Sequence, residues 1–214
     1  RFNLRGPILA DNKENTSNKD VVVIEIDDES FRLIPDPIPY GRGIVWKRVI
    51  KNLSDAGAKV IVIDAMFDRP DHQTKNLSRY FETNKLDVND ILDGDQIFVE
   101  AVQYAKDNDT EVILSGKRAV EENRVPPDYL LKPTQKLIES KNSPSFGLVN
   151  VGPDSDGFMR RYPIFLPITG EQDLYYTLAV ESVLAFKNYQ GDKNIKLDGD
   201  KCLATVGPIN IRTY

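Results

Sequence analysis

Runs of consecutive apolar residues alternate along the chain with segments whose apolar residues recur every three or four positions. Four such runs predict buried strands: VVVIEI at 21–26, KVIVID at 59–64, EVILS at 111–115 and FGLVNV at 146–151. Amphipathic spacing predicts helices at 46–56 and 96–107. This alternation of strand and helix predicts an α/β fold, with a mainly parallel central sheet flanked by helices.

The segment from 21 to 64 has the order of a βαβ unit. Its two strands are therefore expected to be parallel and covered on both faces. Between them, prolines at 35, 37 and 39 exclude a helix from the loop at 34–43. Gly57 is expected to end the helix as a C′ residue.

The remaining segments have weaker patterns. Residues 68–95 form a polar insertion in which only a helical turn near Leu77–Phe81 is expected. The proline-rich region 116–145 predicts at most a short helix near 133–140. The tail at 195–214 has short strand-like pieces around ATV and INI.

The C-terminal half also predicts an antiparallel addition to the sheet. Residues 158–168 read as a strand made irregular by Pro163, which is expected to pair with 146–151 as a hairpin or an added strand. The last helix, 174–189, is apolar nearly all round and is expected to be largely buried, with Asp173 as its N-cap. We expect residues 1–20 to form an entry arm and 21–214 a single domain.

Composition excludes several classes of protein. The net charge is −5 and the basic residues are scattered, so nucleic acid is not an expected partner. Cys202 is the only cysteine, which excludes an internal disulfide and the usual zinc spacings. No phosphate-cradling loop, nucleophile elbow or zinc-protease motif is present, so no cofactor is expected.

The chain has no apolar run of the ~20 residues needed to cross a bilayer. It also begins at Arg1 without a signal-peptide pattern. We therefore expect it to be a piece of a longer protein.

Carboxylates follow the first two predicted strands. Asp27 and Asp28 follow the first, with Ser30 close behind, and Asp64 ends the second. Because parallel strands end at the same sheet edge, we expect these side chains to share a rim, with Arg42 as their positive partner.

Three interpretations of this rim remain open, in decreasing order of preference. The carboxylates cap turns and accept backbone N–H groups; or they shape a small-molecule pocket with Arg42; or they hold a divalent cation for phosphoester hydrolysis. The candidate metal ligands are Asp28, Asp64 and Asp71. His72, the only histidine, is expected to be solvated in a polar loop.

Two further candidates lie in the predicted turn after 146–151. Asp156 belongs to an incomplete calcium-loop pattern that is more typical of a turn. Arg160 can face an anion, but its neighbour Arg161 then points to the other side of the strand.

Five stretches together resemble the type-two CHASE domain, the cyclase and histidine-kinase associated sensory extracellular module of bacterial receptors. They are FNLRGP at 2–7, IEIDDESF at 24–31, PYGR at 39–42, AGAKVIVIDAMFDRPD at 56–71 and FGLVNVGPDSDGFMRRYP at 146–163. They span nearly the whole chain in the family's order. The long insertion at 72–95 and the region 116–145 depart from the pattern.

The resemblance implies a sensor domain outside the bacterial cytoplasmic membrane, held between membrane spans. The family's outputs are adenylate or guanylate cyclases, histidine or Ser/Thr kinases and diguanylate cyclases. The implied partner is a small-molecule or protein signal, and a homodimer is also expected from such outputs. By motif match, the site positions are Asp27, Asp28, Ser30, Arg42, Asp64, Asp156 and Arg160. The alternatives are a ligand-free dimerisation module and a metal-dependent hydrolase.

Overall fold

The computed structural model describes residues 21–34, 39–84, 93–139, 143–152, 155–159, 162–171 and 173–213. The chain divides into two compact units, Arg1–Ile38 and Pro39–Tyr214. Whether 21–214 forms one domain after an entry arm stays a prediction.

The described part of the first unit is an extended segment followed by α1 (Asp28–Leu33). The strand predicted at 21–26 is wrong, because these residues form no strand. The side chains of Val21, Val22, Val23, Ile24 and Ile26 are 47–77% exposed. A run of β-formers becomes a strand only when another strand takes its backbone hydrogen bonds, and no described strand pairs with this segment.

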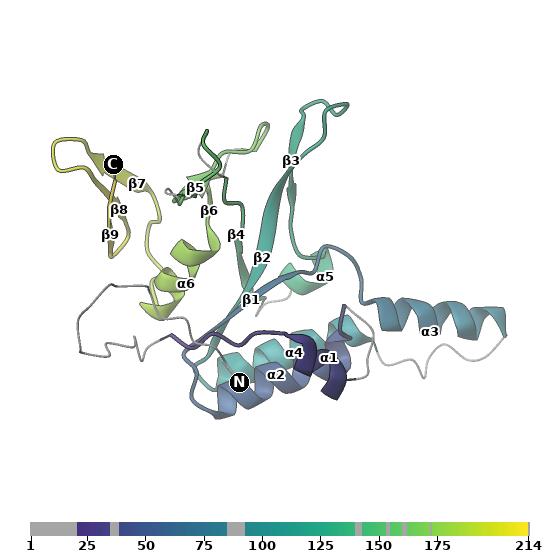
Figure 1. The fold of residues 1–214 in the computed structure, drawn as a ribbon. Coiled ribbons are helices and arrows are strands. Elements are labelled where there is room, and N and C mark those ends of the chain that lie inside the picture. The colour runs from purple at the N-terminus through teal and green to yellow at the C-terminus, as the bar shows by residue number, and fades with distance from the viewer. Residues whose placement is uncertain are drawn as a thin grey trace. The chain divides into compact units, whose positions relative to one another are not determined.

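The second unit is built on a mainly parallel sheet, which confirms the α/β class (Figure 1). The strand β2 (Glu111–Val120) lies between β1 (Val60–Met66) and β4 (Ser145–Leu148) and is parallel to both. Its second half also pairs with an antiparallel strand, β3 (Asp128–Leu131). β3 and this half of β2 fall in the region where the sequence predicted at most a helix.

Helices precede and connect these strands. A π-helical turn, η1 (Arg42–Trp46), leads into α2 (Lys47–Asp55). Two helices, α3 (His72–Thr83) and α4 (Gly94–Asp107), connect β1 to β2, and the short α5 (Gln135–Ile138) precedes β4. The predictions of α2, α4 and α5 are confirmed. In contrast, α3 is far longer than the single turn expected from its polar sequence.

The end of α2 is fixed as its glycine predicts. Gly57 has a φ of 84°, and its N–H donates to the Ser54 carbonyl at 2.9 Å. The N–H of Ala58 donates to the Leu53 carbonyl at 3.0 Å, which completes a Schellman motif. The chain is thereby turned directly into β1.

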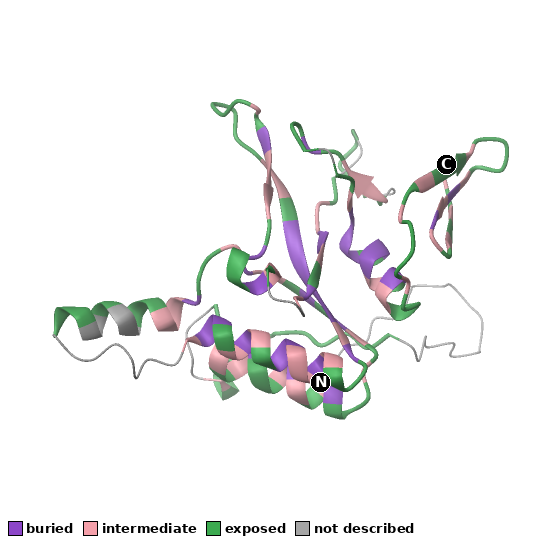
Figure 2. Cartoon of the chain, turned by 180° about the vertical axis from the view of Figure 1, so that it is seen from behind, coloured by how far each residue is buried: buried purple, intermediate pink, exposed green. Residues whose placement is uncertain are grey.

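The sheet is covered unequally. Residues 112–116 of β2 are buried at every position, and α4 and α6 (Leu178–Phe186) both pack against this strand. Figure 2 shows buried residues in the middle of β2 and on α2, α4 and α6. In β1, by contrast, buried Ile61 and Ile63 alternate with exposed Val62 and Asp64. The expectation that both faces of β1 are covered is therefore wrong for the described residues.

The C-terminal half contains the expected antiparallel pairs, but with different partners. The short strand β5 (Phe165–Leu166) pairs with β6 (Tyr175–Tyr176), not with 146–151. Because residues 175–176 are extended, α6 begins after Thr177, and Asp173 is not its N-cap. One face of α6 is buried, while Val183 and Phe186, elsewhere on the helix, are exposed. The helix is thus less buried than predicted.

A second apolar core joins α6 to the tail. The strands β7 (Ile195–Asp198), β8 (Leu203–Val206) and β9 (Ile209–Arg212) form an antiparallel sheet, which confirms strands around ATV and INI. Val206 packs with Tyr176, Val180 and Leu184. Among the described residues, no helix combines the length and the apolar character needed to cross a bilayer.

Candidate functional site

Arg42 begins the π-helical turn and is buried. The backbone N–H of Val45 and that of Trp46 both donate to the Gly41 carbonyl, at 3.0 and 3.4 Å. The turn directs Arg42 and Trp46 inward together, since both side chains are buried. Such π-helical turns occur frequently at functional sites.

The guanidinium of Arg42 forms a buried ion pair with Asp95, from the first turn of α4. The two side chains are only 7% and 6% exposed. Arg42 Nη2 also donates to the Arg69 carbonyl at 2.6 Å, and the guanidinium lies 4.6 Å from the Phe67 ring centroid. The sequence predicted a carboxylate partner for Arg42 but did not identify Asp95.

Asp71 uses both carboxylate oxygens to hold backbone segments. Its Oδ1 accepts the backbone N–H of Arg42 at 2.9 Å. Its Oδ2 accepts the N–H and the hydroxyl of Thr74, at 3.1 and 3.2 Å, at the start of α3. The N–H of Asp71 in turn donates to Asp95 Oδ2 at 3.2 Å. We call Arg42, Asp71, Thr74 and Asp95 the Arg42 cluster.

Gly94 allows this cluster to close. Its N–H donates to the Thr74 hydroxyl at 2.8 Å, and a Cβ at this position would lie 2.6 Å from Asp71 Oδ2. The adjacent Asp93 caps α4 by accepting the N–H groups of Asp95 and Gln96. Although partial burial acts to raise the pKa of Asp93, hydrogen bonds from Lys136 and from the helix N–H groups lower it overall.

A pocket of about 330 Å³ lies beside the cluster, where the chain leaves β1. Its lining includes Tyr40, Arg42, Phe67 and the start of α3. The carboxyl end of a parallel strand is the usual place for a ligand in an open α/β sheet. His72 lines this pocket as the first residue of α3. It is half-buried, which corrects the expectation of a solvated loop histidine.

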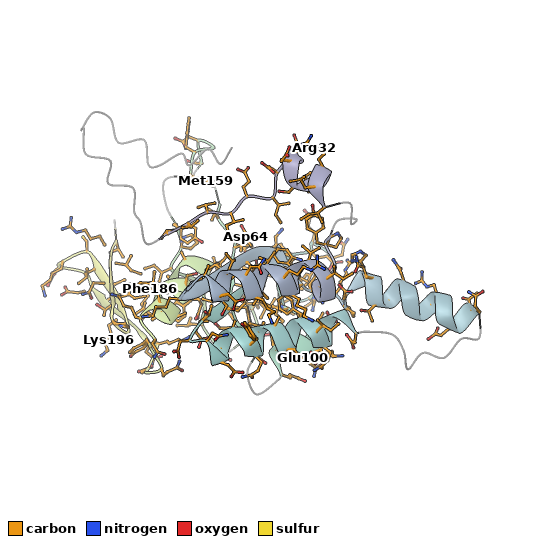
Figure 3. The ribbon with its side chains drawn as sticks, turned by 90° about the horizontal axis from the view of Figure 1, so that it is seen from below. Arg32, Asp64, Glu100, Met159, Phe186 and Lys196 are labelled. Atoms are coloured by element: carbon orange, nitrogen blue, oxygen red, sulfur yellow. The ribbon has the colours of Figure 1, made fainter. Side chains whose placement is uncertain are left out.

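Asp64 lies apart from this pocket's lining. It is exposed and is labelled in Figure 3. It sits in a β-bulge, where the register with β2 shifts between Ile63 and Met66. At the bulge, the buried hydroxyl of Ser115 donates a hydrogen bond to the backbone carbonyl of Ile63 at 2.8 Å. The same hydroxyl lies 3.5 Å from Asp64 Oδ1. Bulges commonly redirect a side chain near a functional site.

Asp27 and Ser30 form a capping box at the start of α1. The Ser30 N–H donates to Asp27 Oδ1 at 2.9 Å, and the Asp27 N–H donates to Ser30 Oγ at 3.3 Å. The hydrogen bonds from Ser30 hold the pKa of Asp27 below its usual value. Asp28 is exposed in the first turn, where a negative charge favours a helix. Within α1, Glu29 pairs with Arg32, which is labelled in Figure 3.

A common rim formed by Asp27, Asp28 and Asp64 stays a prediction, because these residues belong to different units. Asp156 is exposed and accepts the N–H of Phe158 at 3.2 Å, as in a turn. Arg160 lies outside the described residues. Among the residues described, no group of three His, Cys, Asp or Glu side chains is placed to hold a metal ion.

Sequence reasoning missed Asp95, Thr74 and Gly94. One signal was present: Asp93 directly precedes an amphipathic helix, as an N-cap does, which places Asp95 in the first turn. No local pattern, however, indicates that Asp95 meets Arg42 from 53 residues away.

The family comparison decides what kind of domain carries this geometry. A model of the CHASE2 domain matches residues 1–213. The chain belongs to the CHASE2 family. CHASE2 domains are extracellular sensor domains of signalling receptors and are sensory rather than catalytic. Searches of curated proteins and of solved structures find no match to this CHASE2 domain.

Proposed function

We propose that this CHASE2 domain is the extracytoplasmic signal-input domain of a bacterial transmembrane receptor with a cytoplasmic cyclase or kinase. An adenylate or guanylate cyclase is the first output to test, and histidine kinases, Ser/Thr kinases and diguanylate cyclases follow. The observation that carries the proposal is the family match over residues 1–213. A signal acts here by binding one of two arrangements of the domain more tightly than the other.

The membrane side can be tested with the domain's own thiol. Cys202 is the chain's only cysteine and is exposed. In spheroplasts carrying the full-length receptor, we expect a membrane-impermeant maleimide to label Cys202 without permeabilisation. Cys202→Ser supplies the matched control. Labelling that requires permeabilised cells would place the domain in the cytoplasm and overturn the proposal.

The output can be tested in membranes containing the same receptor. We expect cyclase or kinase activity to change when the Arg42 cluster is disrupted by Asp95→Asn. Glu100→Gln, which alters an exposed carboxylate on the same helix, is expected to leave the output unchanged. Equal output from the two variants would argue against a sensory role for this part of the domain.

A ligand-free dimerisation module is the second candidate function. The observation that favours it is the run of exposed apolar side chains at 21–26, which is an unusual surface for a monomer. Light scattering on the purified chain separates the two functions. A dimer whose mass is unchanged by the added small molecules supports the dimerisation module, whereas a ligand-dependent change in mass supports the sensor.

A further inference from the structure

The pocket beside the Arg42 cluster has a lining of mixed character. The buried ring of Phe67, together with Met66, Tyr40 and Pro70, supplies apolar surface. Arg69, His72 and Lys75 contribute polar nitrogen atoms. Apolar walls with a few placed polar groups are typical of small-molecule sites.

One of the two carboxylates of this lining, Asp71, is already engaged. Both oxygens of Asp71 accept hydrogen bonds from Arg42 and Thr74. Asp68 pairs with Arg69 across 3.9 Å. A hard cation entering the pocket would have to displace the donors on Asp71, and Asp68 alone does not supply the several oxygen ligands that such an ion needs.

The groups available to a ligand are nitrogen atoms of Lys75 and His72. Lys75 is exposed and has no ion-pair partner among the described residues. His72 Nε2 is buried without a hydrogen-bond partner in the described structure. Both side chains come from the start of α3, where the helix end itself favours negative charge. A buried polar atom without a partner is costly, and a ligand atom that bonds it recovers that cost.

The size of the pocket limits the ligand. Its volume, about 330 Å³, lies near the lower end of the ~300–1,000 Å³ typical of ligand sites. A nucleotide would not be enclosed by it, whereas a carboxylate with a compact apolar body would be.

We infer that this pocket binds a small organic monoanion, a carboxylate carrying an apolar or aromatic body. The body lies against Phe67 and its apolar neighbours, and the carboxylate faces Lys75 and His72. The inference rests on the proposed sensor function, because it names the chemical class of signal that this domain reads.

The first test compares two probes of equal shape and different charge. Isothermal titration of the purified chain with benzoate is expected to show binding, while uncharged benzamide binds roughly tenfold more weakly, since a charge-assisted hydrogen bond is lost. Acetate and inorganic phosphate test the need for an apolar body, and both are expected to bind more weakly than benzoate. Equal affinity for benzoate and benzamide, tighter binding of phosphate, or no binding of any anion would overturn the inference.

Matched variants locate the site. Lys75→Gln is expected to weaken benzoate binding about tenfold, while Arg79→Gln, one turn further along α3 and outside the pocket, leaves it unchanged. His72→Phe removes the unpartnered nitrogen atom, so it should weaken benzoate binding without lowering the melting temperature. Unchanged affinity in both pocket variants would place the anion elsewhere and contradict the inference.

The receptor assay separates this inference from the proposed function. Benzoate binding without any change in receptor output would retain the site but count against the sensor role. An output that responds to other stimuli, from a domain that binds no anion, would retain the sensor role and exclude this site.

Discussion

The Arg42 cluster and the capping box of α1 use the same residue types in opposite ways. In the Arg42 cluster, Asp71 and Asp95 are buried and bond Arg42 across 29 and 53 residues of sequence. In the capping box, Asp27 is exposed and bonds Ser30, three residues away. The first arrangement ties together the starts of three helical elements, and the second organises a single turn.

The difference lies in what each carboxylate would lose. A buried charge without its partner cannot be hydrated, so breaking a buried pair costs far more than the pair gains when formed. An exposed carboxylate that loses a partner is solvated by water. We therefore expect stability to depend steeply on the Arg42 cluster and weakly on the capping box.

Asp95→Asn should produce the largest effect, because it leaves the buried Arg42 guanidinium without a countercharge. We expect the free energy of unfolding to fall by about 3–5 kcal/mol, measured by urea denaturation. Glu100→Gln on the exposed side of α4 is the matched control, and we expect it to change the value by less than about 0.5 kcal/mol. A loss below about 1 kcal/mol at Asp95 would mean that water reaches the pair, and the contrast would disappear.

Gly94→Ala tests the packing of the cluster without removing a charge. Alanine normally stabilises a helix relative to glycine, but here its Cβ would lie 2.6 Å from Asp71 Oδ2. We expect a net loss of about 1–3 kcal/mol in unfolding free energy, because Asp71 must leave its partners. Gly152→Ala, whose Cβ would meet no atom within 4 Å, serves as the control and should be nearly neutral. A stabilised Gly94→Ala would show that the cluster tolerates displacement.

The same contrast explains what the sequence predicted. Gly57 and the apolar runs at 59–64 and 111–115 act over a few residues, so their patterns are readable. The segment 21–26 has the same pattern as β1 but no strand partner among the described residues. Apolar sequence thus predicts the capacity to form a strand, and tertiary contacts decide whether it forms.

The candidate site was predictable only in part. The stretch PYGR at 39–42 carried part of the family resemblance, Arg42 was predicted to pair with carboxylates, and Asp71 was named as a candidate metal ligand. Asp95 and Thr74 have no local signature, since their roles arise when α3 and α4 meet the turn before α2. In the polar insertion, the length of α3 was underestimated, because tertiary contacts at its first turn compensate for its weak pattern.

Acid should reveal the contribution of a further carboxylate, Asp128, which links the start of β3 to Arg118 and Thr169. Its Oδ2 accepts Thr169 N–H at 3.2 Å and Arg118 Nε–H at 3.0 Å. The hydrogen bonds from Thr169, followed by those from Arg118, outweigh its desolvation and lower the pKa of Asp128. Because the folded pKa is depressed, its contribution to stability is complete above the unfolded value of ~3.9 and is lost as pH falls through the folded value.

The measurement is the unfolding free energy between pH 7 and pH 2 for the unmodified chain and for Asp128→Asn. We expect the variant to be less stable at pH 7 and the difference to shrink below pH ~3.9. If the difference in unfolding free energy stays constant with pH, the negative charge of Asp128 does not contribute to stability.

Asp27→Ala should produce the smallest change and completes the contrast. The variant removes an N-cap whose pKa is lowered by hydrogen bonds from Ser30, so local order in α1 should decrease. None of the residues of α1 is buried, so few tertiary contacts depend on that helix. We expect the melting temperature to shift by less than ~1 °C, while amide exchange at Ser30 and Phe31 becomes roughly fivefold faster.

Asp27→Asn retains a capping oxygen atom and should restore most of the protection, because the cap requires an acceptor more than a charge. A melting temperature that falls as far as in Asp95→Asn would instead mean that the capping box supports long-range packing, and the two clusters would no longer differ in kind.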